Sequence, residues 1–409
     1  MQKSEFAQKN NQANLYIHIP FCKSKCHYCN FISFANKNEL IEPYFDALRQ
    51  EIDFCFEEWI ASSAAKPLGK ESIHALPAKL SALAPPRNDN NLLETIYIGG
   101  GTPSVVDFVF YKDLFEFLSG LNNISANAEI TMEINPGTID LNYLKNIRNL
   151  GINRLSIGVQ SFDDKILKFI NRIHNSEEAI ETVKLAQRAG FENISIDLIY
   201  GLPEQTSDGW EKTLNRALTL GINHISTYGL KIEENTEFFR HKPKNLPDDE
   251  KQSQIYLKTI EVLENKGFNH YEISNFSKKG KESRHNLCYW KNQEYYGFGL
   301  SAHGYLEGIR YSNTENLEEY LKNPTKRAFE NPVSSSERLE EAIFLGLRLT
   351  AGINTEEFKI NYGIDIRQKY SKIIEKYINY GFMAYENHAL KLTNHGILLS
   401  NSILADFLA

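Results

Sequence analysis

The sequence lacks any apolar run as long as a membrane-spanning helix, and residues 1–14 are polar, unlike the apolar stretch of a secretory signal. It also lacks a basic excess, because 45 Lys and Arg stand against 52 Asp and Glu, a formal net charge of −7. A protein that binds nucleic acid or an anionic membrane normally carries a basic patch or stripe. We therefore expect a cytoplasmic protein with no transmembrane segment and no nucleic-acid partner.

Cysteine is scarce, with five in 409 residues, but three of the five stand close together. Cys22, Cys26 and Cys29 follow the alternating apolar run 15–20, which predicts a strand, so they belong to the loop that leaves it. This clustering fits a reducing compartment better than a disulfide framework. Three cysteines are one ligand short of a structural zinc site, but they suit a [4Fe-4S] cluster with one iron open. The alternative is three reduced thiols without a metal.

Beyond this loop, short apolar strands alternate with longer amphipathic segments, which predicts βα units around a parallel sheet. The expected strands are 15–19, 95–98, 129–134, 154–159, 193–199 and 224–228. The expected helices are 38–59, 107–118, 140–150, 176–189 and 207–220. Right-handed crossovers curl such a sheet, and six units predict an α/β fold with a partial (βα)6 barrel. Residues 61–91 are rich in Ala, Ser, Pro and Asn without a period, which predicts an exposed insertion.

Polar residues recur where these strands end, which is where parallel βα barrels carry their active sites. The second strand runs into the glycines 99–101, and the alternation of the later strands sets Glu133, Gln160 and Asp197 opposite the aliphatic face. We expect these three side chains to converge in the lumen near the cysteine loop. Each of these residues also has an interpretation without function. The glycines could form a simple turn, and Glu133, Gln160 and Asp197 could be buried polar groups whose hydrogen bonds are made within the protein.

The motifs around these residues are specific in combination. They are Y-I-H-I-P-F-C at 16–22, G-G-G-T-P-S at 99–104, E-I-N-P-G at 133–137, S-I-G-V-Q-S-F at 156–162 and D-L-I-Y-G-L-P at 197–203. With the cysteine triplet, they make the chain resemble the radical S-adenosylmethionine (SAM) superfamily and, more narrowly, its oxygen-independent coproporphyrinogen III oxidase-like family. In such proteins one electron from the reduced cluster cleaves SAM to methionine and a deoxyadenosyl radical, and the protein orients the cofactor.

The resemblance also implies residue roles. Cys22, Cys26 and Cys29 would hold the [4Fe-4S] cluster, whose open iron would chelate the amine and carboxylate of SAM. Arg172 suits a carboxylate, and Asp197 suits ribose hydroxyls. The full SAM site implied by the resemblance comprises Tyr16, Tyr28, Gly100, Gly101, Thr102, Glu133, Gln160, Arg172 and Asp197.

Two features distinguish branches within this family. In the dehydrogenase branch, a fourth cysteine stands one residue beyond the third, and a longer N-terminal segment precedes the first strand. Here Asn30 and Phe31 follow Cys29, and only fourteen residues precede the first expected strand. The run H-N-L-C-Y-W at 285–290 resembles the H-N-x-x-Y-W motif of the heme-chaperone branch, HemW. The resemblance thus implies a heme chaperone, rather than an enzyme, that passes heme to acceptor hemoproteins such as respiratory proteins.

Other functions stay open. One is an oxygen-independent coproporphyrinogen III dehydrogenase, a radical SAM oxidative decarboxylase. Another is a cluster-bearing regulatory protein without turnover. Transient contact with membrane proteins and self-association are also left open by the sequence.

Within the H-N-L-C-Y-W run, His285 is the first candidate ligand for heme iron, and Tyr289 and Trp290 could provide flat apolar surface. The alternative for His285 is a hydrogen-bonded histidine that fixes the Tyr-Trp segment against the barrel. Cys288 is a second candidate, with a small buried hydrophobe as the favoured alternative. His270 and His303 are weaker candidates.

The last hundred residues change in character. Helices are expected at 336–349, 355–360, 366–380 and 396–408, with a hairpin at 381–393. This part resembles the family's small, helical, winged-helix-like C-terminal domain. The expected division is an N-terminal tail at 1–14, the radical SAM core at 15–250, a core extension at 251–310 and the C-terminal domain at 311–409.

Overall fold

The six expected strands form the centre of one sheet in the computed structural model, which describes residues 12–64, 92–121 and 123–408. They lie side by side in chain order, all parallel, which confirms the predicted radical SAM type of α/β fold. Their bounds are β1 (Gln12–Ile19), β4 (Leu92–Gly100), β5 (Asn123–Ile134), β6 (Arg154–Gln160), β7 (Asn193–Tyr200) and β8 (His224–Gly229).

Three further strands at the edges of the sheet were not expected from the sequence. β11 (Tyr296–Phe298) pairs in parallel with β1, while β10 (Asn275–Ser277) pairs antiparallel with β8 and with β9 (Asn269–Glu272). Each has three or four residues, too few to show alternation. The hydrogen-bonded order of described strands starts at β11 and ends at β9, so the sheet has two edges, as a partial barrel requires.

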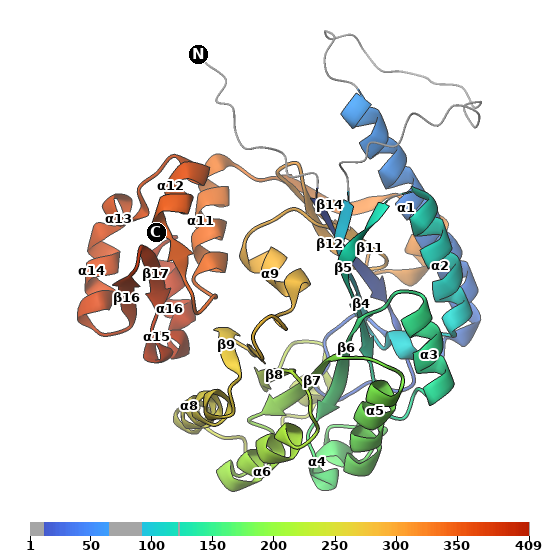
Figure 1. Ribbon diagram of the computed structural model, residues 1–409, viewed down its shortest axis with the longest axis horizontal. Coiled ribbons are helices and arrows are strands. Elements are labelled where there is room, and N and C mark those ends of the chain that lie inside the picture. Colours follow the sequence, from blue (N-terminus) through green and yellow to red (C-terminus); the bar gives the residue numbers. More distant parts are fainter. Residues whose placement is uncertain (1–11, 65–91, 122, 409) are drawn as a thin grey trace.

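The helices after the strands cover the outer face of the curved sheet (Figure 1). Side-chain caps explain where several begin; in α5, for example, Asn175 and Glu178 form a capping box. The core helices are α1 (Ile41–Ala64), α2 (Phe108–Leu121), α3 (Leu141–Asn149), α4 (Asp164–Phe169), α5 (Ser176–Arg188), α6 (Ser207–Leu218), α7 (Glu237–Arg240) and α8 (Asp249–Asn265). Two 3-10 turns are η1 (Asn38–Leu40) and η2 (Pro103–Val105).

Helix α1 extends beyond its expected end at residue 59. Residues 61–64, assigned to the start of the insertion, are its last residues, and 65–91 lie outside the described part of the chain. The exposed insertion therefore stays a prediction. None of the helices in the described ranges is both long and apolar enough to cross a membrane.

The main core lies between the sheet and these helices. Leu15, Ile17 and Ile19 of β1 are fully buried and belong to the same apolar cluster as Leu48 and Ile52 of α1. Burying each such side chain stabilises the fold by about 1.5–3 kcal/mol. The opposite faces of the strands are left to line the lumen.

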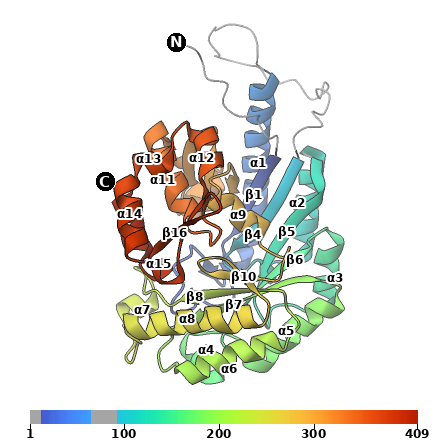
Figure 2. The ribbon, with the colours of Figure 1, turned by 60° about the vertical axis from the view of Figure 1, so that its left-hand side comes forward.

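The C-terminal part forms a separate group of helices with a small sheet, next to α9 (Arg284–Trp290), which lies between it and the main sheet (Figures 1 and 2). The expected hairpin is present, but the helices expected at 366–380 and 396–408 are each divided, at Tyr370 and Leu399. The elements are α11 (Ser335–Gly346), β15 (Ile353–Asn354), α12 (Thr355–Tyr362), α13 (Ile366–Lys369), α14 (Ser371–Asn379), β16 (Met383–Glu386), β17 (Ala389–Leu392), α15 (Asn394–Leu398) and α16 (Ser400–Asp406).

Short elements connect the core to this part of the chain. β12 (His303–Leu306), β13 (Ile309–Asn313) and β14 (Arg327–Pro332) form a three-stranded antiparallel sheet, with α10 (Leu317–Lys322) between the last two. The domain boundary expected at residue 311 stays a prediction.

A buried carboxylate joins α1 to this connecting region. Glu51 accepts hydrogen bonds from Gly299 N at 2.8 Å, from Asn313 Nδ2 at 2.6 Å and from the Tyr320 hydroxyl at 2.7 Å. Its side chain is only 3% exposed, so water cannot replace these bonds.

We predict that Glu51→Ala lowers the free energy of unfolding by about 3 kcal/mol, because three buried donors lose their acceptor. Chemical denaturation followed by circular dichroism measures this. Glu42→Ala, an exposed position on the same helix, is the control and should change stability by less than about 1 kcal/mol. An unfolding midpoint for Glu51→Ala equal to that of the control would contradict the prediction.

Candidate functional site

The cysteine loop lies at the carboxyl end of β1, held against the glycine turn that follows β4. Gly101 N donates to Ile19 O at 2.9 Å, and Thr102 N donates to Phe21 O at 2.8 Å. The Thr102 hydroxyl also lies 3.4 Å from Cys22 Sγ. Cys22 ends the short strand β2 (Phe21–Cys22), which pairs with β3 (Phe34–Ala35). The loop and the glycine turn therefore form one unit.

The three cysteines are half-buried and have polar surroundings. Arg172 Nη1 donates a hydrogen bond to Cys26 Sγ at 3.4 Å, and the Tyr28 hydroxyl is hydrogen-bonded to the same sulfur. Burial raises the pKa of the Cys29 thiol. Among the described residues, no three His, Cys, Asp or Glu side chains converge on a single metal ion. A cubane does not need such convergence, because each thiolate binds a different iron, so three half-buried thiols on one loop suit a [4Fe-4S] cluster.

The glycine turn is tightly enclosed, so only glycine fits there. Gly100 has φ +110°, and a Cβ on it would stand 2.6 Å from the His18 ring. A Cβ on Gly101 would stand 2.8 Å from Phe21 O and 3.1 Å from Cys22 Sγ. Backbone thus approaches the cysteine loop more closely than a side chain would permit.

Two carboxylates face the lumen, as the alternation of the strands predicted. Glu133 accepts from the Tyr97 hydroxyl at 2.8 Å and from Gly100 N at 3.1 Å, and burial raises its pKa to about 7. Asp197 accepts from Ser156 Oγ at 3.1 Å, and burial raises its pKa as well. Both are half-buried, whereas the aliphatic residues that flank them in sequence are buried. Two acids in one enclosed lumen suit a ligand with an amine and hydroxyl donors, as SAM has.

A second cluster of polar side chains surrounds Gly158. A Cβ on this glycine would stand 2.5 Å from Asn135 Oδ1, 3.0 Å from Gln160 Nε2 and 3.1 Å from Arg172 Nη2. Arg172 donates to Asn135 Oδ1 at 2.6 Å, and Asn135 Nδ2 donates to Thr102 Oγ1 at 2.8 Å. This chain of contacts connects Gln160 and Arg172 to the glycine turn and the cysteine loop.

Gln160 reaches this position differently from what simple alternation implies. The register between β6 and β7 shifts after Ile157, and Gln160 has φ +68°. The strand therefore ends in a left-handed turn, a backbone conformation that residues other than glycine seldom adopt.

Tyr16 lies deeper in the lumen than Glu133, in a column of stacked aromatic rings. Its ring stacks on Tyr97 at 6.2 Å between centroids, and its hydroxyl is 3.0 Å from His18 Nδ1. Tyr97 stacks in turn on His285, at 5.3 Å. The column links the predicted SAM site to α9.

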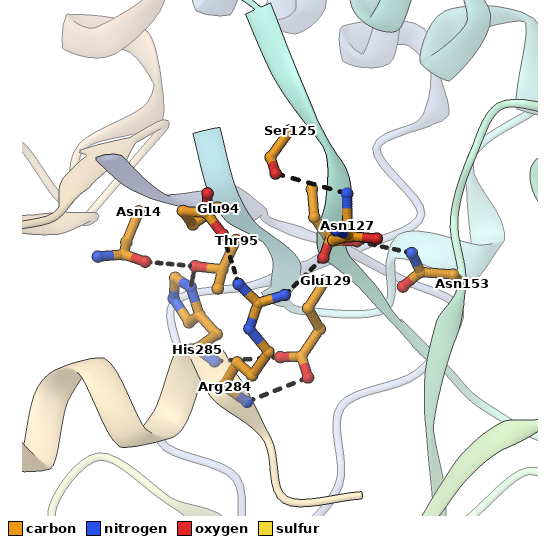
Figure 3. A network of polar contacts seen from close by, with 10 residues as sticks. Asn14, Glu94, Thr95, Ser125, Asn127, Glu129, Asn153, Arg284 and His285 are labelled. Carbon is orange, nitrogen blue, oxygen red and sulfur yellow. Dashed lines mark hydrogen bonds and ion pairs between the residues drawn. The ribbon is translucent and has the colours of Figure 1, made fainter. Parts of the chain in front are cut away.

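His285 anchors α9 to Thr95 of β4 and Glu129 of β5 (Figure 3). Its Nδ1 is 2.7 Å from Thr95 Oγ1, its Nε2 is 2.7 Å from the Tyr289 hydroxyl, and its backbone N–H donates to Glu129 Oε1 at 3.0 Å. The neighbouring Arg284 donates from its backbone to the same carboxylate. The His285 side chain is 1% exposed, and burial lowers its pKa to about 3, so it is neutral.

The direction of these hydrogen bonds follows from the donors available. Asn14 Nδ2 donates to the carbonyl of Glu294, which leaves Asn14 Oδ1 to accept the Thr95 hydroxyl proton at 2.9 Å. Thr95 Oγ1 must then accept from Nδ1–H of His285, so Nε2 accepts from the Tyr289 hydroxyl.

Both ring nitrogens of His285 are thus occupied, which favours the structural interpretation of this histidine over iron ligation in this conformation. Cys288 is 2% exposed and burial raises the pKa of its thiol to about 12, as expected for a small buried hydrophobe. His270 is buried and stacks on Phe276 at 4.4 Å, whereas His303 is exposed.

Comparisons with known proteins agree with the geometry. The radical SAM superfamily matches residues 16–217, and the HemN C-terminal domain matches residues 333–399. "Heme chaperone HemW" of Bacillus subtilis is 34% identical over 401 residues, 96% of this chain and 98% of the relative. Its counterpart in Escherichia coli is 32% identical over 402 residues, 97% and 98% of the two chains.

The chain belongs to the HemW family of radical SAM proteins. Coproporphyrinogen III oxidase (HemN) from Escherichia coli has a similar structure, with a TM-score of 0.79 over 97% of this chain and 89% of that one. At 21% sequence identity, this likeness shows a shared fold alone.

Three participants in this HemW-family site were absent from the residues predicted to line it. Asn135, Tyr97 and Ser156 each contact a predicted site residue directly. Ser156 in β6 and Asn135, just after the end of β5, both continue the lumen-facing alternation, so alternation could have identified them. Tyr97 carries the same signal, because it alternates with the buried Ile96 and Ile98 in β4.

We predict that Gly101→Ala lowers the iron and sulfide bound per chain after anaerobic reconstitution at least twofold, because the new methyl group collides with Phe21 O and Cys22 Sγ. Gly120→Ala is the matched control, since it adds a methyl group to α2 with nothing within 4 Å. Equal iron contents in the two variants would show that the tight packing does not position the cysteines.

Proposed function

We propose that this chain is a heme chaperone that holds a [4Fe-4S] cluster and SAM, binds heme and delivers it to acceptor hemoproteins. The observation that carries the proposal is the near-complete coverage of relatives named "Heme chaperone HemW" at 34% identity. The absence of a cysteine one residue beyond Cys29 supports it from within the sequence.

In this proposal Cys22, Cys26 and Cys29 hold the cluster, which when bound supplies the one-electron chemistry of the family. Arg172 stands beside Cys26 Sγ, where a guanidinium favours a thiolate and can meet a carboxylate. Glu133 and Asp197 would accept the donors of SAM, and Gly100 to Thr102 would present backbone to it. Tyr16, Tyr28 and Gln160 complete the walls of this site.

We also propose a cytoplasmic location and transient contact with acceptor proteins, consistent with the absence of a membrane-crossing helix among the described residues. An enzyme of the coproporphyrinogen III dehydrogenase type is the second candidate function. Its support is the structural likeness to coproporphyrinogen III oxidase, an enzyme with the same fold.

We predict that Cys22→Ala abolishes the visible absorption of the reconstituted cluster, because a cubane with two protein ligands is poorly retained. Cys288→Ala, the matched control, should keep it, since that thiol lies outside the loop and is buried. A variant at Cys22 that still binds four irons per chain would contradict the ligand assignment.

We predict that the reconstituted wild type binds one heme per chain and transfers it to an apo-hemoprotein, while coproporphyrinogen III incubated anaerobically with SAM and a reductant keeps all its carboxyl groups. Optical titration measures binding, and mass spectrometry measures decarboxylation. Absence of heme binding would overturn the chaperone function, and stoichiometric loss of carboxyl groups would favour the enzyme. Binding without transfer to any apo-acceptor would favour a regulatory role.

A further inference from the structure

A cavity of about 590 Å³ opens at the junction between the core extension and the C-terminal domain, apart from the site at the cysteine loop. Its walls come from the end of α9 and the segment after it, from β13 and β14, from α11 and from Leu408. This volume lies within the range of about 300–1,000 Å³ in which proteins hold cofactor-sized ligands.

The cavity has flat apolar walls on two sides. Tyr289, Trp290 and Tyr295 contribute aromatic rings from the side of the core, and Phe344 and Leu345 contribute apolar surface from α11. α9 and α11 are in contact, so the two walls are held close together. A planar apolar ligand between them would remove surface from water, a gain of about 25 cal/mol per Å² of apolar area.

Polar groups at the cavity suit a ligand that carries carboxylates. Arg310 lines it, paired through two bonds of 2.6 and 2.8 Å with Glu341, and it also donates to Asn292 Oδ1 at 3.2 Å. The buried Nε1 of Trp290 has no acceptor among the described residues. Of the other acids lining it, Glu337 is committed to the α11 capping box, and Glu340 accepts from Ser336 Oγ at 3.2 Å. The guanidinium and the indole N–H are groups that a propionate could approach.

Oxygen atoms are the iron ligands that this cavity offers. Among its described lining residues there is no histidine, cysteine or methionine, and His285 is not part of the wall. The Tyr289 hydroxyl donates to His285, but the Tyr295 hydroxyl lies next to Arg310, which can donate to it. Ferric heme accepts a phenolate oxygen as its axial ligand in some proteins.

We propose that this cavity receives the heme and that Tyr295 supplies the oxygen ligand to its iron, an inference that rests on the proposed chaperone function. On binding, the O–H bond of Tyr295 breaks, an O–Fe bond forms and the proton leaves to water. The iron stays ferric, so no electron is transferred. The H-N-x-x-Y-W run then contributes the cavity wall, with His285 as the residue that positions Tyr289.

The location is tested by filling the cavity. Leu345 lines it but lies outside the described apolar core, so Leu345→Trp should fold and raise the Kd for ferric heme at least tenfold. Ile360→Trp on α12, where the side chain is 79% exposed, is the matched control with unchanged Kd. Val333→Trp is a second wall variant in case the first fails to fold. Both variants should keep the wild-type iron–sulfur content.

Heme bound equally tightly by the wall variants and the wild type would overturn the location and favour the lumen beside the SAM site. This result differs from failure of the proposed function, in which the wild type itself binds no heme.

The ligand is tested by the spectrum of bound ferric heme. Tyr295→Phe should remove the phenolate-to-iron charge-transfer band, while Tyr289→Phe, a tyrosine of the same wall, should keep it. An unchanged spectrum in Tyr295→Phe, or a wild-type spectrum without this band, would overturn the assignment of Tyr295.

Discussion

The site depends on one constraint, the convergence of parallel strand ends at a single edge of the sheet. Two backbone hydrogen bonds, from Gly101 N to Ile19 O and from Thr102 N to Phe21 O, fasten the turn after β4 to the loop after β1. They require glycine, because a Cβ on Gly101 would meet Phe21 O at 2.8 Å. Around these joined loops, Glu133 accepts from Gly100 N and Arg172 donates to Cys26 Sγ.

Helix α9 is hydrogen-bonded to strands β4 and β5 at the other end of the lumen. Its first residues bind Glu129 through two backbone N–H groups (Figure 3). His285 accepts from the Tyr289 hydroxyl and donates to Thr95, which in turn donates to Asn14. The last residues of α9 face the C-terminal domain and line the cavity there. A single short helix thus separates the predicted SAM site from the proposed heme site, and the ring column of Tyr16, Tyr97 and His285 runs between them.

Strong periodic patterns made much of the fold predictable. The six central strands and their helices are long enough to show their period, and Glu133 and Asp197 face the lumen as the alternation predicts. The edge strands β9 to β11 were not found, because three or four residues carry no period. The alternation placed Gln160 on the lumen side as part of a regular strand, whereas a register shift and a left-handed backbone bring it next to Gly158.

The sequence by itself determined the cysteine triplet, the glycine turn and the positions of the central strands along the chain, since spacing and periodicity are local properties. Only the tertiary structure decided the role of His285, because its ring partners, Thr95 and Tyr289, come from a distant strand as well as from its own helix. The cavity beside Trp290 is likewise visible only in three dimensions, since its walls join segments from residue 289 to residue 408. Burial and hydrogen-bond saturation depend on contacts between such distant segments, and no local pattern encodes them.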